Sequence, residues 1–434
     1  MSWFYEEGTL SKENILALVH QAAEEALDRF CDSPKKVLLL PPDITRAHSG
    51  AGWITEEFYK IFAATADVHL IPTLGQHVPH TPKQNAWMFG SVPKSKIHVH
   101  DWRGGSKRIG EVSAAFVKEI SKGKADWEIP VSLNKMLLDE KWDIIINIGH
   151  IVPHEVLGFA NHNKNYFIGL GGKETICASH MMAACCGIEN NLGQLITPLR
   201  ACYNEAEDQY LSELPDFYFQ VVMAYDDAGN LGHTGVYVGD DLETYLMGAK
   251  ASREKNITVV PPLEKVVAVM QGDEFYSTWV ANKAIYRTRK AMADGGELLI
   301  IAPGLKRFGE QEDVDQLIRK YGYCGTEKVM KLWKTEPVLQ DLTHGTAHLI
   351  HGSSEGRFKI TYAPGRLTKQ EMESVGFGYA DLAATVKRYD PAKMKNGFNT
   401  MPDGEKVYYI STPSAGLWTT REKLYPKRLE NDLF

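Results

Sequence analysis

The stretch KVLLLPPDITR, residues 36–46, begins with an apolar run of strand length and ends in a polar turn that two prolines introduce. An apolar run without polar alternation is typical of a strand buried on both faces, as in a parallel sheet covered by helices. Similar runs occur at Val68–Pro72 and Asp143–Ile148, and apolar periodicity predicts helices at Glu13–Arg29 and near Thr55–Ala66. We therefore expect an α/β fold that begins with a Rossmann-like parallel sheet carrying helices on both faces.

The second half of the chain repeats this alternation of strands and helices. Lys265–Met270 and Glu297–Ala302 are predicted strands, and Ser277–Met292 between them is a predicted helix. The pattern predicts a second, smaller α/β domain.

The boundary between the two predicted domains falls in a proline-containing stretch, residues 255–264. We place the catalytic domain at 1–262 and the second α/β domain at 263–434, because a chain of 434 residues exceeds one ordinary core. We expect the active site at the interface of the domains. The C-terminal segment, with ordered-looking runs at Val407–Ser411 and Thr419–Leu424, is expected to pack back on the first domain.

Bulk composition narrows the class of protein. The chain is 44% hydrophobic and 24% charged with a net charge of −7, which fits a globular protein without broad attraction to nucleic acid or anionic membranes. We found no apolar stretch long enough to cross a bilayer and no signal-peptide pattern in the acidic N-terminus. The six cysteines include no CxxC pair, which favours reduced thiols over metal–thiolate chemistry. We expect a cytoplasmic protein whose partner is a small molecule.

Five polar side chains stand at or just after predicted strand ends: Asp43, Arg46, His77, His150 and His154. Ligands of parallel α/β sheets bind beyond the carboxyl ends of the strands, so we expect these residues to share one site. Arg46 offers a planar fork that suits a carboxylate ligand. A loop-stabilising ion pair between Asp43 and Arg46 is the alternative.

A metal pair is the first reading of His150 and His154, which are four residues apart. Pro153 between them opposes a continuous helix, and Glu155 is misplaced for an HExxH motif, so a plain zinc site is disfavoured.

The glycine-rich run GLGGKET, residues 169–175, precedes a helix-like stretch that contains His180. Glycines before a helix favour phosphate binding, although the spacing matches neither a Walker A motif nor a complete GxGxxG fingerprint. His180 and its neighbours also fit an ordinary core patch.

Two further groups of histidines are predicted to be structural. His98 and His100 alternate as on one face of a strand. His344, His348 and His351 have helical spacing that would suit a metal, but no suitable carboxylate lies near them in the sequence.

Taken together, these motifs resemble the nickel-pincer lactate racemase family. The ordered set is DITR after one strand, GQH after the next, PHEVLGF in a later loop, then Lys164 ten residues after His154 and His180 sixteen residues after Lys164. The resemblance extends over nearly the whole chain.

The resemblance implies a cofactor. This is a nickel-pincer nucleotide, a pyridinium-3-thioamide-5-thiocarboxylic acid mononucleotide with nickel, attached covalently at Lys164, with His180 as the protein ligand to nickel. An imidazole nitrogen suits nickel. Proteins that synthesise the cofactor and insert nickel are the implied partners. Further cofactor-binding candidates are Thr45, Gly169, Gly171, Gly172, Lys173 and Thr175.

The resemblance also implies racemisation or epimerisation at C2 of a 2-hydroxy acid, by hydride transfer through a 2-keto acid. His77 and His154 match the two acid–base histidines, and histidine can exchange protons near neutral pH. Arg46 matches a substrate-orienting group, Asp43 an organiser of the site, and Lys283 a lysine from the second domain.

The sequence departs from the racemase pattern around these residues. Asn161-His162-Asn163 stands where lactate enzymes tend to have a Gly-Gly pair, and Val280 replaces a glutamine before the second-domain lysine. We therefore expect a substrate other than lactate, such as the sugar acid D-gluconate, contacted by His48, Gln76, Asn161 and His162. A shell with Tyr276 and Trp279 would instead favour an aromatic 2-hydroxy acid.

Several alternatives remain open at this stage. The substrate alternatives are lactate, malate or an aromatic 2-hydroxy acid. The functional alternatives are an NAD-dependent oxidoreductase and a non-enzymatic nickel-nucleotide carrier.

Overall fold

The computed structural model describes residues 2–226, 230–272 and 275–425, which form two compact units. The first unit comprises Met1–Ser179 and Gln194–Lys255, and the second comprises His180–Gly193 and Asn256–Phe434. The predicted domains, 1–262 and 263–434, differ from this division because the segment His180–Gly193 groups with the second unit.

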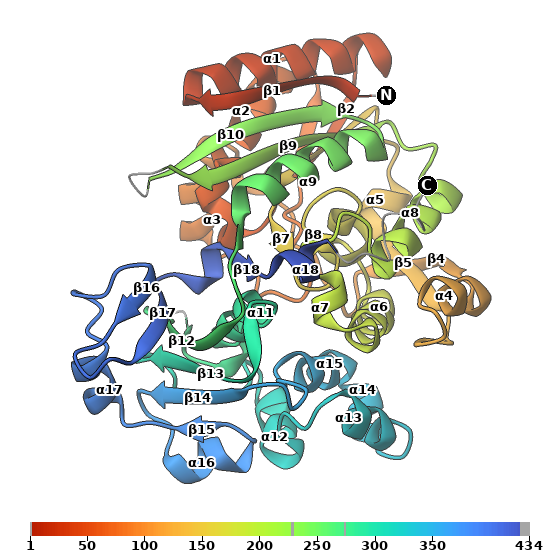
Figure 1. Ribbon diagram of the computed structural model, residues 1–434. Coiled ribbons are helices and arrows are strands. Elements are labelled where there is room, and N and C mark those ends of the chain that lie inside the picture. The colour runs from red at the N-terminus through yellow and green to blue at the C-terminus, as the bar shows by residue number, and fades with distance from the viewer. Residues whose placement is uncertain (1, 227–229, 273–274, 426–434) are drawn as a thin grey trace. The chain divides into compact units, whose positions relative to one another are not determined.

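The first unit is built on a six-stranded mixed sheet with the order β1-β10-β9-β6-β2-β3, of which Figure 1 shows β1, β10 and β9 side by side. The four strands β9, β6, β2 and β3 are mutually parallel, whereas β1 and β10 are antiparallel to their neighbours. The prediction of an all-parallel sheet was therefore wrong at one edge. The strand bounds are β1 (Ser2–Leu10), β2 (Lys36–Leu40), β3 (Asp67–Leu70), β6 (Ile144–His150), β9 (Asp216–Tyr225) and β10 (Leu231–Gly239).

One face of this sheet packs against α1 (Lys12–Arg29) and α2 (Ala51–Phe62). The core there includes Ile15 of α1, Phe58 of α2 and Leu39 of β2, each with no exposed surface. Burying a side chain of this size contributes about 1.5–3 kcal/mol.

The opposite face of the sheet is polar at its centre. Because side chains alternate along a strand, Asn147 of β6 and Tyr218 and Gln220 of β9 point away from the α1–α2 core. All three are buried. This polar face underlies the loop that carries Lys164.

The first unit also contains shorter elements around the sheet. They are η1 (Ile44–Ser49), α3 (Pro82–Phe89), η2 (Lys94–Lys96), β4 (Ser106–Val112), α4 (Ala114–Ile120), β5 (Ile129–Asn134), α5 (Lys135–Asp139), β7 (Pro153–His154), β8 (Gly158–Phe159), η3 (Asn165–Gly169), α8 (Pro198–Tyr210) and α9 (Leu242–Asn256). Helix α6 (Lys173–Cys186) continues across the point where the chain passes from the first unit to the second.

The second unit has its own six-stranded sheet, with the order β15-β14-β13-β12-β17-β16, in which only β16 is antiparallel. It contains the strands predicted at Lys265–Met270 and Glu297–Ala302. The strand bounds are β12 (Leu263–Val269), β13 (Met292–Ala302), β14 (Lys359–Pro364), β15 (Gly378–Tyr379), β16 (Gly397–Thr400) and β17 (Lys406–Ile410).

The C-terminal runs lie within the second unit. Strand β17 pairs with β12, and β18 (Leu417–Thr419) pairs in parallel with β11 (Ile257–Val259).

The predicted helix Ser277–Met292 is two short helices, because the backbone turns at Asn282, whose side chain accepts a hydrogen bond from Tyr362. The helices are α7 (Ile188–Asn191), α10 (Thr278–Ala281), α11 (Lys283–Thr288), α12 (Glu312–Tyr321), α13 (Thr326–Trp333), α14 (Pro337–Asp341), α15 (Thr343–His351), α16 (Lys369–Ser374), α17 (Leu382–Arg388), η5 (Pro413–Ala415) and α18 (Arg421–Leu424).

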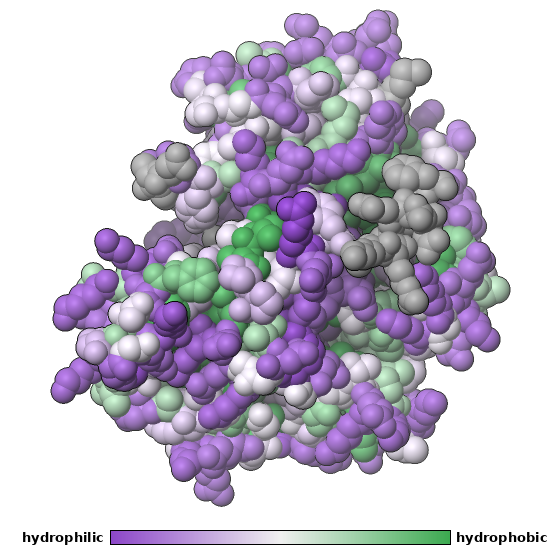
Figure 2. All heavy atoms as spheres, viewed as in Figure 1, coloured by the Kyte–Doolittle hydropathy of each residue, from purple (hydrophilic) through white to green (hydrophobic). Residues whose placement is uncertain are grey.

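Hydrophilic side chains dominate the face shown in Figure 2, as expected from the charged content. Among the described residues, no helix is both long and apolar enough to span a membrane. All six cysteines are free thiols.

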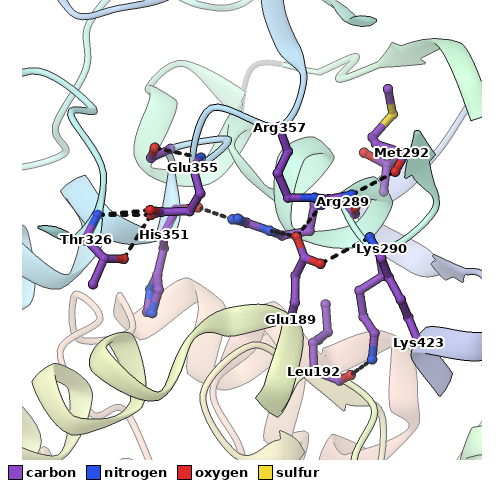
Figure 3. A network of polar contacts seen from close by, with 12 residues as sticks. Glu189, Leu192, Arg289, Lys290, Met292, Thr326, His351, Glu355, Arg357 and Lys423 are labelled. Carbon is purple, nitrogen blue, oxygen red and sulfur yellow. Dashed lines mark hydrogen bonds and ion pairs between the residues drawn. The ribbon is translucent and has the colours of Figure 1, made fainter. Parts of the chain in front are cut away.

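The segment His180–Gly193 is held in the second unit by a charged network centred on Glu189 of α7 (Figure 3). Its carboxylate pairs with Arg357 at 2.6 Å, Arg289 at 3.2 Å and Lys423 at 3.3 Å. The buried Lys290 ammonium donates to the Leu192 carbonyl at 3.1 Å. One carboxylate therefore balances three cations, of which Arg289 is almost fully buried.

We predict that Glu189→Gln lowers the free energy of unfolding of the second unit by roughly 1.5–3 kcal/mol, because Arg289 loses its charged acceptor while it stays buried. Urea denaturation measures this loss, and hydrogen exchange should rise within residues 180–193. The matched control is Asp294→Asn, which removes a carboxylate that is 82% exposed and 2.9 Å from Arg357; it should change stability by no more than about 0.5 kcal/mol. Equal effects of the two substitutions would contradict the assignment.

Candidate active site

The DITR motif forms a capped 3-10 turn, η1, directly after β2. Asp43 caps the turn by accepting hydrogen bonds from the Thr45 backbone N–H at 2.9 Å and from the Thr45 hydroxyl at 2.5 Å. The Ile44 N–H donates to His80 Nε2 at 2.8 Å. The Thr45 hydroxyl, which we predicted to bind a cofactor, is thus engaged with Asp43.

The second Asp43 oxygen holds His77, which lies in the loop after β3. Asp43 Oδ2 contacts His77 Nδ1, while the His77 side chain is 56% exposed and Asp43 is buried. Burial acts to raise the pKa of Asp43, but the hydrogen bonds and charges of His77, Thr45 and Arg46 outweigh it and hold that pKa well below its usual range. An ionised Asp43 places the His77 proton on Nδ1, which leaves Nε2 to exchange a proton with a ligand.

Sequence reasoning missed His80, which supports this pair. His80 Nδ1 lies 3.0 Å from Asn85 Oδ1, an acceptor, so the proton is on Nδ1 and Nε2 accepts from Ile44. Burial lowers the pKa of His80, which favours this neutral form. The only signal in the sequence was its place three residues after His77.

His154 has the opposite tautomer from His77. It lies in β7, which pairs with β8, and its Nδ1 accepts the Val156 N–H at 3.2 Å. In the neutral form its proton is therefore on Nε2. The hydrogen bonds thus prepare His77 as a proton acceptor and His154 as a proton donor.

Lys164 is presented by a loop whose other side chains point inward. Within residues 161–166, every side chain except that of Lys164 is buried. Asn165 donates to Asn147 at 2.6 Å and to Asn161 at 2.8 Å. A single π-helical turn, η3, follows, a conformation that is common at functional sites.

The remaining loop side chains anchor in the polar interior. Asn163 donates to Glu207 at 2.9 Å, and the Tyr166 hydroxyl donates to Asp216 at 2.5 Å. The His162 ring stacks on Tyr218 with centroids 4.2 Å apart. Asn161 and His162, which we predicted to contact substrate, are thus parts of the buried frame.

The amine of Lys164 is electrostatically activated. Burial lowers the pKa of Lys164 to about 8, the positive charges of Arg46 and Arg200 act in the same direction, and Asp43 opposes them. The neutral, nucleophilic form of the amine is therefore far more populated near neutral pH than for an ordinary lysine.

Arg46 and His48 belong to the η1 turn, and His48 makes an edge contact with His150 at 5.6 Å between ring centroids. His150 is 6% exposed, and neither of its ring nitrogens has a hydrogen-bond partner. The Gln76 Nε2 is also buried without an acceptor. The His150 ring nitrogens and Gln76 Nε2 therefore retain hydrogen-bonding capacity for a ligand.

The glycine-rich run serves close packing. The Gly172 N–H donates to Ser132 and the Lys173 N–H to Trp102, each at 2.8 Å, so these donors are not available to a phosphate. A side chain on Gly169 would collide with Thr73, and one on Gly171 with the Phe167 carbonyl. The Thr175 hydroxyl accepts from the Ser132 N–H at 2.8 Å. Within the run, the side chains of Lys173 and Glu174 are exposed, and Lys173 is the one that carries a positive charge.

The N-terminal part of the chain is similar to a known protein family. Residues 6–191 match the family model described as lactate racemase N-terminal domain. Those residues belong to the lactate racemase family. No curated protein matches the chain in sequence.

Two solved structures share the fold over almost their whole length. A Thermotoga maritima protein has 23% identity and a TM-score of 0.78, with 96% of this chain and 100% of that one covered. The lactate racemase apoprotein from Thermoanaerobacterium thermosaccharolyticum has 16% identity and a TM-score of 0.69, with coverage of 95% and 94%. At these identities the likeness establishes the fold alone.

In the lactate racemase pattern, a glycine pair tends to precede the lysine that corresponds to Lys164. Here Asn161 and His162 have φ angles of 73° and 58°. Glycine adopts this left-handed conformation freely, whereas other residues need compensating contacts. The backbone fits a glycine pair, and buried side-chain contacts stabilise it instead.

The other predicted site residues belong to the second unit. His180 is a half-buried residue of α6, and Lys283 begins α11. Trp279 lies against His348, with ring centroids 4.4 Å apart, and Lys306 stands 5.3 Å from the centre of the Tyr276 ring. Their roles toward a ligand stay predictions.

Of the α15 histidines, His348 is held within the protein by two tyrosines. His348 Nδ1 lies 2.9 Å from the Tyr286 hydroxyl and Nε2 lies 3.1 Å from the Tyr323 hydroxyl, so both nitrogens are occupied. Burial lowers the pKa of His348 to about 3, so it is neutral. In the described part of the chain, no group of three or more His, Cys, Asp or Glu residues is arranged to hold a metal.

A cavity of about 670 Å³ lies in the second unit, and none of the predicted site residues lines it. Its lining includes Cys324, Glu355 and Lys359. Cavity size therefore does not identify the candidate site.

We predict that Lys164→Met stabilises the protein by roughly 1–2 kcal/mol at pH 7. Between pH 8 and 10.5 the folded state binds fewer protons at Lys164 than the unfolded state, so the free energy of unfolding rises with pH in this range. Below pH 8 the amine is charged in both states, and its charge destabilises the folded state. The gain is smaller than the full shift implies because the side chain is partly exposed. Urea denaturation at pH 7 and 9.5 should show the gain shrinking at the higher pH. Lys173→Met, at an exposed lysine, is the control and should change stability little at either pH; a gain there equal to that of Lys164→Met would contradict the prediction.

Proposed function

We propose that this protein is a nickel-pincer nucleotide-dependent racemase or epimerase that inverts C2 of a 2-hydroxy acid. The observation that carries the proposal is the electrostatic coupling of the DITR turn to Lys164: Asp43 holds His77, and Asp43 and Arg46 both act on the lysine amine. Family membership of residues 6–191 supports the class of reaction.

The chain's own residues fit the proposed cofactor. Lys164 supplies an activated amine for covalent attachment. Gln76 Nε2 and the His150 ring nitrogens are buried donors or acceptors without protein partners, as expected beside a polar ligand. We propose His180 as the nickel ligand and Lys173 as the phosphate contact, since it is exposed at the start of α6. When bound, the cofactor would accept the C2 hydride and return it.

The protein side chains would manage the proton and the carboxylate. Arg46 would hold the substrate carboxylate through its planar fork. His77, with its proton on Nδ1, would accept the 2-hydroxyl proton at Nε2, and His154, when protonated to the imidazolium, would donate a proton from Nε2 to the 2-keto oxygen as hydride returns to C2, which leaves a neutral imidazole. Lys283 would assist from the second unit. The reverse reaction exchanges the two roles.

The substrate proposal changes with the placement of the side chains. Asn161 and His162 are buried in the frame, so the argument for a sugar acid such as D-gluconate now depends mainly on Gln76 and His48, although Asn161 Nδ2 and both His162 ring nitrogens also lack partners. The unpartnered Gln76 amide adjoins His77 and would bind an additional hydroxyl. Tyr276 and Trp279 already make contacts within the protein, which weakens the aromatic alternative.

The alternatives of an NAD-dependent oxidoreductase and of a nickel-nucleotide carrier have less support. The glycine-rich run lacks the dinucleotide fingerprint GxGxxG, and a carrier would not need the Asp43–His77 pair.

Coexpression with the cofactor-biosynthesis proteins should add the mass of the cofactor to the intact protein. Lys164→Ala should abolish the adduct because the attachment amine is gone, whereas Lys173→Ala should retain a covalent adduct. Intact-protein mass spectrometry makes this measurement. An unmodified wild-type mass, under conditions that load another lactate racemase, would overturn the proposal.

The loaded enzyme should epimerise D-gluconate at C2 and retain deuterium from the C2-deuterated substrate, because hydride moves without exchange with solvent. Asp43→Asn should lower kcat by about 10²–10⁴-fold, since the His77 tautomer is no longer fixed. NMR of the products tests both points. Racemisation of malate or phenyllactate without activity on aldonates would reject the substrate, and loss of deuterium to water would reject hydride transfer.

A further inference from the structure

Arg200 is a fully buried arginine of α8 whose guanidinium lies beneath the loop that leads to Lys164. It donates to the Phe159 carbonyl at 2.8 Å and, through both terminal nitrogens, to the Asn161 carbonyl at 3.3 Å. It also donates to Asn163 Oδ1 and, at 3.1 Å, to the Tyr245 hydroxyl. One side chain thus binds three alternate positions of the loop.

These contacts satisfy groups that no regular secondary structure serves. Buried carbonyl groups need hydrogen-bond donors, and the loop between β8 and η3 has no ladder to supply them. The same contacts flank Asn161 and His162, the two consecutive residues with left-handed φ angles. Arg200 therefore stabilises the backbone conformation from which Lys164 emerges.

The charge of Arg200 is not neutralised by a direct partner. Within the described residues, no carboxylate forms an ion pair with it. Glu207 is connected to it through the Asn163 amide, and burial raises the pKa of Glu207. The positive field of the guanidinium therefore reaches the neighbouring amine. Lys164 is otherwise influenced by Arg46 and Asp43 of the η1 turn and by Glu155.

We propose that Arg200 is a positioning residue for Lys164: its hydrogen bonds to residues 159, 161 and 163 fix the loop from which the lysine emerges. The importance of Lys164 as the attachment point rests on the proposed function. The effect of Arg200 on the amine does not, so the two can be tested separately.

The test uses the purified, cofactor-free full-length protein and its variants. Acetylation of Lys164 by acetic anhydride is measured from pH 6 to 11 by peptide mass spectrometry, with the exposed Lys118 of α4 as an internal reference. Arg200→Met removes the charge and the hydrogen bonds, whereas Arg200→Lys keeps the charge with fewer donors. Phe58→Leu weakens the core on the opposite face of the sheet and controls for general destabilisation.

Arg200→Met should shift the Lys164 acetylation profile to higher pH and lower the rate at pH 7.5 by roughly threefold or more, the effect of half a pKa unit. Arg200→Lys should keep a profile near that of the wild type but show faster hydrogen exchange at residues 160–166. Phe58→Leu should change neither. A folded Arg200→Met variant with the wild-type profile and exchange rates would overturn the inference.

Cofactor loading supplies the second readout. Both Arg200 variants should form less adduct than the wild type and Phe58→Leu. If the wild type forms no adduct while Arg200→Met shifts the acetylation profile, the proposed function fails and the positioning role stands. If the wild type loads but Arg200→Met changes neither the acetylation profile nor the exchange rates, the positioning role fails alone.

Discussion

The first unit depends on a buried cation that holds an irregular loop over a polar sheet face. Arg200 donates to backbone and side-chain oxygens of the loop before Lys164. Asn147 of the sheet accepts a hydrogen bond from Asn165, the residue that follows Lys164. Burying a guanidinium is costly unless its donors find acceptors, so the loop and the arginine require each other. This mutual requirement explains why a loop with two left-handed non-glycine residues is ordered without a β ladder.

The same balance of burial and charge governs the DITR turn. Asp43 is buried but stays ionised because His77, Thr45 and Arg46 stabilise its charge. It therefore serves both as a helix cap and as the partner that determines the His77 tautomer. Lys164 experiences the opposite balance, in which burial and two cations favour the uncharged amine. The pKa values of both groups are thus lowered, which keeps Asp43 ionised and makes Lys164 easier to deprotonate.

Short apolar runs were sufficient to predict β2, β3 and β6, since a strand buried on both faces has few alternatives at that length. β1 was not predicted because its sequence, SWFYEEGTL, is half-exposed and polar at an edge, and no apolar run marks it.

Arg200 was missed because TPLRACYNEAEDQY has the composition of a surface helix, and composition does not show that one side chain reaches inward. Asn161 and His162 were placed toward the substrate because the direction of a side chain depends on φ, which the sequence alone did not reveal. Asp43, His77 and His154 were predicted as site residues from strand ends and motif order.

The departures from the lactate racemase pattern therefore divide into two kinds. Asn161, His162 and Asn163 replace small residues, yet their side chains stack, accept and donate within the protein, so they compensate for a backbone that glycine would adopt without help. Such changes alter how the lysine is held. Substrate preference must depend on groups whose hydrogen-bonding capacity the fold leaves unused: Gln76 Nε2 and the His150 ring nitrogens are such groups, and so are Asn161 Nδ2 and the His162 ring nitrogens. A residue that differs from its family is evidence about specificity only when its polar atoms remain available to the ligand.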